Sequence, residues 1–194
     1  EALLNDGKNP FYSYDDFIKF RDHSSPYTHP SVNWCDELMN KNSTTQSYNL
    51  NATGGNKYAQ YFISVGYVGE NGLFKNPGGD AHDTNMTFDR YMISSKVNIN
   101  ITDDLTAKVT LMGRIEEGNQ PGGISGTGYS DLLSNVWQTP NNAYPVLNPN
   151  GTYGGNASYT QNLYAQTTGS GYISSNTRDV VGLSLIHISE PTRR

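Results

Sequence analysis

The sequence has one cysteine, few charged residues and no long apolar run. The single cysteine, Cys35, excludes an internal disulfide framework and the paired-cysteine spacing of a zinc ribbon. No apolar stretch approaches the roughly 18 residues of a transmembrane helix, so no such helix is predicted. The net charge of −5 argues against a nucleic-acid partner.

The residues that are abundant point to an all-β protein. Charged residues are only 16% and hydrophobic residues 35% of the chain, which also holds 20 Gly and 14 Tyr. This composition is unusual for a cytosolic enzyme and suits strands joined by long polar loops. The sequence contains no nucleophile–base–acid set, no phosphate-binding loop and no metal-ligand cluster. We therefore predict that the protein is not an enzyme and holds no cofactor or metal.

The stretch from Phe88 to Glu116 alternates apolar and polar residues in two runs, joined by the turn Thr102-Asp103-Asp104. Successive side chains of a strand point to opposite faces, so each run predicts one apolar and one polar face. Soluble strands usually stop near 5–6 residues, whereas about 9–11 are needed to cross a membrane at a tilt. The hairpin therefore indicates a wall between lipid and water.

The same pattern recurs along the chain. We expect strands at 44–53, 57–69, 88–101, 105–117 and 176–182, with long loops at 70–87 and 118–175. We expect residues 1–42 to form a loop region with a short helix near 14–22 and a helical turn at Trp34–Met39. A further helix is expected at Asp131–Gln138. Short turns alternating with long loops are typical of an outer-membrane barrel, with the turns periplasmic and the loops extracellular.

The last twelve residues differ in origin from the rest. Leu183 to Arg194 match, in order, the translation of an adapter used to build sequencing libraries. Such segments are set aside before the fold is considered. The alternative is a natural terminal strand. We expect an adapter-derived artefact at 183–194 and a fragment truncated at both ends.

Several motifs follow one another in a particular order. They are Asn33-Trp34, Gln46 to Gly55, Lys57 to Tyr67, Glu70-Asn71-Gly72, Phe88 to Tyr91, Tyr144-Pro145-Val146 and Asn148 to Asn156. Their order and spacing resemble the SusC/RagA family of TonB-linked outer-membrane transporters, over most of residues 1–182. Ser47 stands where the family usually has Asn.

The resemblance implies a transmembrane β-barrel of 22 strands, of which this chain would supply about four to five. It implies import of glycans or oligopeptides across the outer membrane of a Gram-negative, Bacteroidetes-type bacterium. The implied partners are a SusD-like lipoprotein and the TonB complex. TonB would act through an N-terminal plug upstream of Glu1.

One strand face carries charges and the other carries tyrosines. The expected lumen-facing residues are Arg90, Lys96, Lys108, Arg114 and Glu116. They could bind the plug or line the substrate path, but we expect charge pairs with the plug or with neighbouring strands, because a polar lumen is general in such barrels. On the lipid face, Tyr48, Tyr61, Tyr67 and Tyr91 suit an aromatic girdle.

The long loop gathers aromatic residues among Gly and Asn. Tyr129, Trp137, Tyr144 and Tyr153 are candidate substrate-binding residues, because sugar faces stack on rings while amides bind hydroxyls. The alternative, which we favour, is packing within the loop or against the lipoprotein. Asp80, His82 and Asp83 could bind a cation, although a solvated loop is the simpler expectation.

A soluble, secreted β-sandwich adhesin or carbohydrate-binding module is the competing interpretation. Its apolar faces would meet in one core. The two interpretations place one group of side chains differently: Ile93, Val97, Ile99, Val109 and Leu111. A sandwich buries them against a second sheet, whereas a barrel leaves them as an exposed band.

Overall fold

A computed structural model describes residues 7–75, 85–123 and 128–189. The chain divides into two compact units. A helical unit contains the described parts of 1–41, 74–84 and 121–172, and a sheet unit contains the described parts of 42–73, 85–120 and 173–194. Most of the regular structure is antiparallel β-sheet, as predicted.

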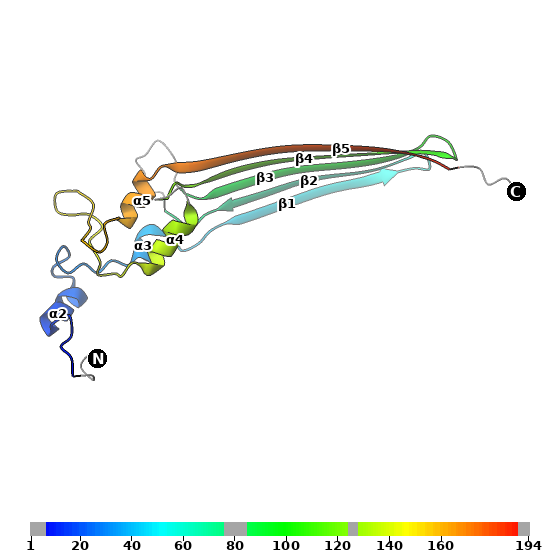
Figure 1. Ribbon diagram of the computed structural model, residues 1–194. Coiled ribbons are helices and arrows are strands. Elements are labelled where there is room, and N and C mark those ends of the chain that lie inside the picture. Colours follow the sequence, from blue (N-terminus) through cyan, green and yellow to red (C-terminus); the bar gives the residue numbers. More distant parts are fainter. Residues whose placement is uncertain (1–6, 76–84, 124–127, 190–194) are drawn as a thin grey trace. The chain divides into compact units, whose positions relative to one another are not determined.

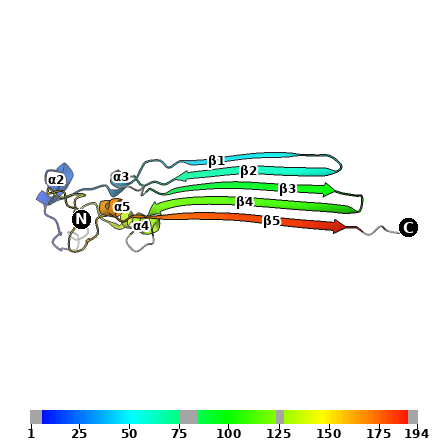
Figure 2. The same cartoon turned by 90° about the horizontal axis from the view of Figure 1, so that it is seen from above.

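The sheet unit is built on one open sheet of five strands in the order β1-β2-β3-β4-β5 (Figure 1). Each strand lies beside its neighbour in the sequence (Figure 2). The strands are β1 Thr45–Gly55, β2 Ala59–Asn71, β3 Thr87–Asn100, β4 Leu105–Pro121 and β5 Tyr172–Ile188.

The last two strands are longer than the alternation indicated, whereas β2 and β3 have the expected lengths. β4 and β5 each have 17 residues. β4 ends at Pro121 instead of 117, and β5 spans 172–188 instead of 176–182. The expected loops shorten accordingly. β5 therefore runs into the adapter-like residues, because an apolar segment beside an unpaired strand edge will pair with it whatever its origin.

Two tight turns close the hairpins. Between β1 and β2, the Asn56 side chain accepts hydrogen bonds from the backbone N–H groups of Tyr58 (2.8 Å) and Ala59 (3.0 Å). Gly55 precedes this turn with φ 153°, where a Cβ would lie 2.5 Å from the Ala59 carbonyl oxygen. The turn therefore requires glycine. Pairing extends from Gly55 opposite Gln60 to Thr45 opposite Glu70.

Three contacts give the register of β5 against β4, because they all fit one antiparallel alignment of the two strands. The Asn176 amide donates to Glu117 Oε1 (3.1 Å), and Arg114 Nε donates to Asp179 Oδ2 (3.1 Å). Beyond the strands, the Ser189 N–H donates to the Asp104 carbonyl (2.9 Å). In an antiparallel pair, these contacts put Val180 opposite Gly113.

The helical unit contains four short helices among the described residues: α2 Tyr14–Asp22, α3 Trp34–Leu38, α4 Tyr129–Gln138 and α5 Leu163–Gly169. None of the described helices is long and apolar enough to cross a membrane. The helix α5 was not predicted from the sequence. Its cap is Asn162, whose side chain accepts from the Ala165 N–H (3.1 Å) and donates to the carbonyls of Val146 and Gly154.

The only fully buried apolar side chains in the described part of the chain are in the helical unit. They form one cluster: Trp34, Leu38, Phe74, Leu132, Val136, Tyr144 and Leu163. The Trp34 and Tyr144 rings lie 4.9 Å apart. The indole N–H of Trp34 donates to the Pro140 carbonyl at 3.3 Å. Segments that we expected to be separate loops thus share a core.

The two tryptophans provide a test of this core. Trp34 is 1% exposed, whereas Trp137 is 70% exposed. We expect Trp34→Ala to destabilise the helical unit by about 3–5 kcal/mol through the cavity it leaves, and Trp137→Ala to cost less than about 0.5 kcal/mol. Amide hydrogen exchange of α3, α4 and α5, measured as urea is increased, gives the change in unfolding free energy for both variants. Equal costs would contradict the burial.

Helix α2 provides a pH test. The Ser13 side chain accepts from the Asp16 N–H (3.2 Å), and Asp16 Oδ2 accepts from the Ser13 N–H (2.8 Å). The Ser13 backbone N–H, the Ser13 hydroxyl and His29 lower the Asp16 pKa from 3.8 to about 2. Because this pKa is depressed, the cap is complete above pH 3.8 and is lost as the pH falls through about 2.

The measurement is the carboxyl-carbon NMR shift of Asp16 during acid titration. We expect its midpoint near 2 in the native chain and closer to 3.8 in Ser13→Ala, which removes the hydroxyl donor. A native midpoint at 3.8 would show that the cap does not form in solution.

Candidate functional site: a sheet with one apolar and one charged face

One face of the sheet is apolar and exposed. Residues directly opposite in the ladder share a face, and the apolar positions of β1 to β4 align in this way. Leu50, Val65 and Ile93 form one row across three strands. Of the five residues that distinguish a barrel from a sandwich, Ile93, Ile99, Val109 and Leu111 are 40–50% exposed, and Val97 is half-buried.

Tyrosines cross the apolar face in a row. Tyr48 is opposite Tyr67, and Tyr67 is opposite Tyr91. The ring centroids are 6.1 Å apart for the first pair and 5.1 Å for the second. The Tyr67 hydroxyl donates to Asp89 Oδ1 at 2.7 Å. The tyrosine rings therefore continue the apolar face, while the Tyr67 hydroxyl makes a polar contact with Asp89. Tyr61 lies on the same face, nearer the first tight turn.

The opposite face carries the charges. Arg90 Nε donates to Glu116 Oε1 at 2.7 Å, and the Arg114 guanidinium lies 3.6 Å from the same carboxylate. Arg114 also binds Asp179 on β5. Glu116 thus joins Arg90 and Arg114, three of the expected lumen-facing residues, in one chain of ion pairs. Asp179, which was not predicted from the sequence, extends this chain onto β5. These charges are neutralised within the sheet.

The two lysines of the expected set are not part of this chain. Lys96 is opposite Thr110, and Lys108 is opposite Asn98, on the same face as Arg90. Within the described residues, neither lysine has a hydrogen bond or ion pair. Both are exposed. They leave a positive region on the half of this face nearer the tight turns.

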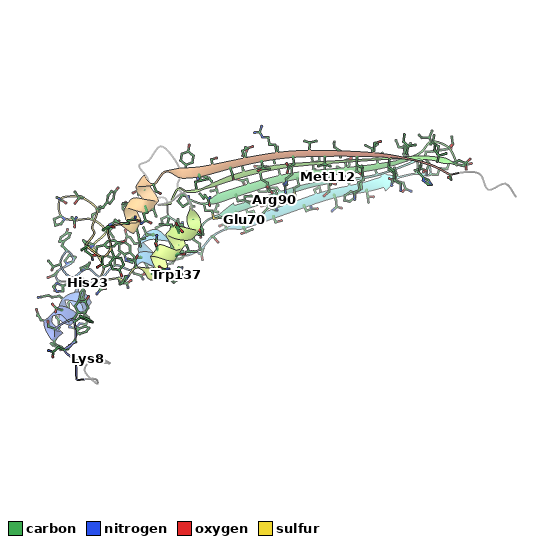
Figure 3. All side chains as sticks on the ribbon, viewed as in Figure 1. Lys8, His23, Glu70, Arg90, Met112 and Trp137 are labelled. Atoms are coloured by element: carbon green, nitrogen blue, oxygen red, sulfur yellow. The ribbon has the colours of Figure 1, made fainter. Side chains whose placement is uncertain are left out.

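Beside Arg90 the charged face is hollowed. The hollow measures about 420 Å³ and is lined by residues that include Glu70, Phe88, Arg90, Gln120 and Ser175. Figure 3 labels Glu70 and Arg90 on the sheet. The guanidinium carbon of Arg90 lies 5.0 Å from the centre of the Phe88 ring. Gly118 leaves the space open, since a Cβ there would lie 2.7 Å from Ser175 Oγ.

The alternation changes near the end of β5. The register places Val181, Leu183 and Leu185 on the charged face, opposite Met112, Thr110 and Lys108. All three are more than half exposed. No leucine or isoleucine occupies this face in β1 to β4. The leucines begin at the residue where the adapter-like sequence begins.

The four candidate sugar-binding residues fall in different environments. Tyr144 is 2% exposed, and its hydroxyl accepts from the Leu163 N–H (3.2 Å). Its ring cannot stack on a sugar, so we correct the expectation and assign Tyr144 to the core. Tyr129 packs edge-on against Phe74, with ring centroids 5.2 Å apart.

The other two candidates are accessible. Trp137 is 70% and Tyr153 50% exposed. Trp137 is labelled on α4 in Figure 3. Tyr153 lies near Tyr164, with ring centroids 6.4 Å apart. The structure thus does not bring the four residues together in one site.

The cation candidates lie at 80–83, outside the described residues. In the part of the chain that is described, no group of three His, Cys, Asp or Glu side chains is arranged to hold a metal ion.

Comparison with known proteins identifies no family. The chain matches no protein-family model and has no significant match among curated proteins.

The ion pairs on the charged face can be measured by a double-mutant cycle. Arg90 and Glu116 are partly exposed, so we expect the Arg90→Met, Glu116→Gln cycle to give a coupling free energy of about 0.5 kcal/mol. The coupling should fall in 1 M salt. Urea unfolding of the chain in detergent measures it. The matched control is Lys96→Gln with Glu116→Gln, for which we expect no coupling.

Proposed function

We propose that this chain is part of the wall of an outer-membrane β-barrel, of the kind that SusC/RagA transporters use to import glycans or oligopeptides. The observation that carries the proposal is the exposed apolar face of a single sheet of very long strands. Water would leave that face unstable, because soluble proteins rarely expose apolar patches of such extent.

The height of the apolar face suits a bilayer. From the Tyr91 row to Ile101, the residue after the end of β3, the chain advances about 10 residues, or roughly 33 Å at about 3.3 Å per residue. A strand tilt of about 40° reduces this to about 25 Å, the height of the apolar band of outer-membrane barrels. Tyrosines lie toward both limits of the band, as interfacial aromatic residues do.

The charged face suits a water-filled lumen. It is the only face of the described sheet with several ion pairs, and a polar interior alternating with an apolar exterior is the dyad pattern of such barrels. The unpaired Lys96 and Lys108 and the hollow beside Arg90 are the places where a plug or a substrate would make contact.

The open edges support the idea of a larger whole. β1 and β5 are the edges of the described sheet. A barrel in lipid must pair every edge, so further strands would close this sheet. The tight turns and the long connections leave the sheet at opposite ends, which matches periplasmic turns and extracellular loops.

The partners follow from the resemblance. A plug and TonB would drive import using the proton gradient, and a SusD-like lipoprotein would cover the extracellular side. The described residues support the barrel over the sandwich adhesin, because the sandwich requires a second sheet against Ile93 and Leu111, and neither residue is buried.

The test uses two adjacent apolar residues on opposite faces of β4. Leu111 is 50% exposed on the apolar face and Met112 is 45% exposed on the charged face; Met112 is labelled in Figure 3. We expect Leu111→Lys to weaken insertion into lipid vesicles by about 2–4 kcal/mol, because a lysine near the bilayer centre is costly. Met112→Lys should have little effect.

The measurement is the fraction of chain that floats with vesicles and resists protease after refolding from urea, under conditions where several copies can pair their open edges in the bilayer. Without lipid or detergent we expect aggregation, because both edges and the apolar face are uncovered. A soluble monomer that melts cooperatively, or equal effects of the two lysines, would overturn the proposal.

A further inference from the structure

The helical unit contains a polar pocket of about 360 Å³. It lies between the end of α4, the segment before α5 and α5 itself. The side chains that line it include Asn135, Gln138, Tyr159, Gln161 and Gln166. None of the four candidate sugar-binding residues from the sequence is among its lining residues.

The lining is rich in amides and has no charge among the described residues that form it. Three glutamines, one asparagine, three hydroxyl side chains, one tyrosine and Leu163 make up its wall. Amides donate and accept hydrogen bonds at once, as do the hydroxyls. Such a wall matches a ligand that carries many neutral hydroxyl groups.

Gln166 shows that this wall lacks a donor. Its side chain lines the pocket and the residue is 8% exposed. Its Oε1 is buried and has no hydrogen-bond partner in the described structure. An unsatisfied buried polar atom costs about 1–3 kcal/mol. This oxygen is buried, so a ligand O–H would reach it only when the Gln166 amide turns toward the pocket, and the new hydrogen bond would then recover that free energy.

The pocket is held open by the backbone around it. The Asn156 side chain accepts from the N–H of Ser158 (2.9 Å) and of Tyr159 (2.8 Å). The Tyr144 hydroxyl donates to the Gln161 carbonyl (3.1 Å) from the core. The segment 158–161 is therefore fixed at both ends, and a preformed site loses less entropy on binding.

We propose that this pocket binds one neutral sugar unit of a glycan. The sugar ring packs against Tyr159, which is 36% exposed. One sugar hydroxyl donates to Gln166 Oε1 after the amide turns toward the pocket, and Asn135 and Gln138 bind others. The volume lies at the small end of ligand pockets. An acidic sugar is disfavoured, because the pocket lining offers its carboxylate no cation.

The inference rests on the proposed function for its biological role, since it assigns a glycan subsite to a transporter. It differs from the loop aromatics of the sequence analysis, because it assigns binding to amides around a concave site instead of to the exposed Trp137 and Tyr153. The experiment separates these alternatives.

The probes are cellotetraose, mannotetraose and xylotetraose, with tetragalacturonate as the acidic control and tetraalanine as the peptide control. The 194-residue chain is refolded in a detergent without a sugar head group, which would otherwise compete. Saturation-transfer NMR measures binding. We expect transfer to at least one neutral tetrasaccharide and none to the uronate or the peptide. Binding of the peptide alone, or of no probe, overturns the proposal.

The variants locate the site. Tyr159→Ala and Gln166→Met should each weaken binding at least fivefold. Gln166→Met removes the unsatisfied oxygen at nearly equal volume, so the helical unit should be no less stable in urea. A purely structural Gln166 would instead leave binding unchanged and lower stability. Trp137→Ala is the matched control, and loss of binding in that variant alone would favour the exposed aromatics.

The two proposals fail differently. If the pocket is wrong, the chain still inserts into vesicles but no neutral glycan receives saturation. If the barrel is wrong, vesicle insertion fails, while the chain without pocket substitutions still binds sugar.

Discussion

Antiparallel pairing in a single register is the constraint on which the sheet unit depends. Residues opposite each other share a face, so the register carries the apolar pattern of each strand onto the next. A slip of one residue between β3 and β4 would move every apolar side chain of one strand to the charged face. The tyrosine row and the apolar band on one face, and the cross-strand ion pairs on the other, therefore all depend on the same hydrogen-bond ladder.

On the charged face, the arginines and carboxylates neutralise one another. Glu116 lies between Arg90 and Arg114, and Asp179 binds Arg114 from the next strand. The Arg90–Glu116 and Arg114–Asp179 pairs lie across strands, so both depend on the register. Lys96 and Lys108 have no such partner in the described residues, and this asymmetry leaves the positive charge nearer the tight turns. In a barrel, a plug or a substrate would meet it there.

The helical unit was much harder to predict than the sheet. Helices α2 and α4 follow from local signals, namely the Ser13 capping box and the run after Ser130. Helix α5 has a weak pattern, and its cap, Asn162, is one of many Asn in the chain. The core brings Trp34 against Tyr144, and the polar pocket brings Asn135 near Gln166. No local pattern reports contacts between segments so far apart, although the amide-rich composition of 156–166 was a usable signal.

Strand identity, strand parity and the hairpin turns were encoded locally, because the two-residue period and the turn chemistry act over a few neighbours. The five strands and the face of every predicted charge follow from that period alone. The lengths of β4 and β5, the pairing of Asp179 with Arg114 and the common core of distant loops were decided by tertiary structure. Each of these depends on which segment lies beside which, and that choice is made by burial and pairing over the whole chain rather than by any one stretch of it.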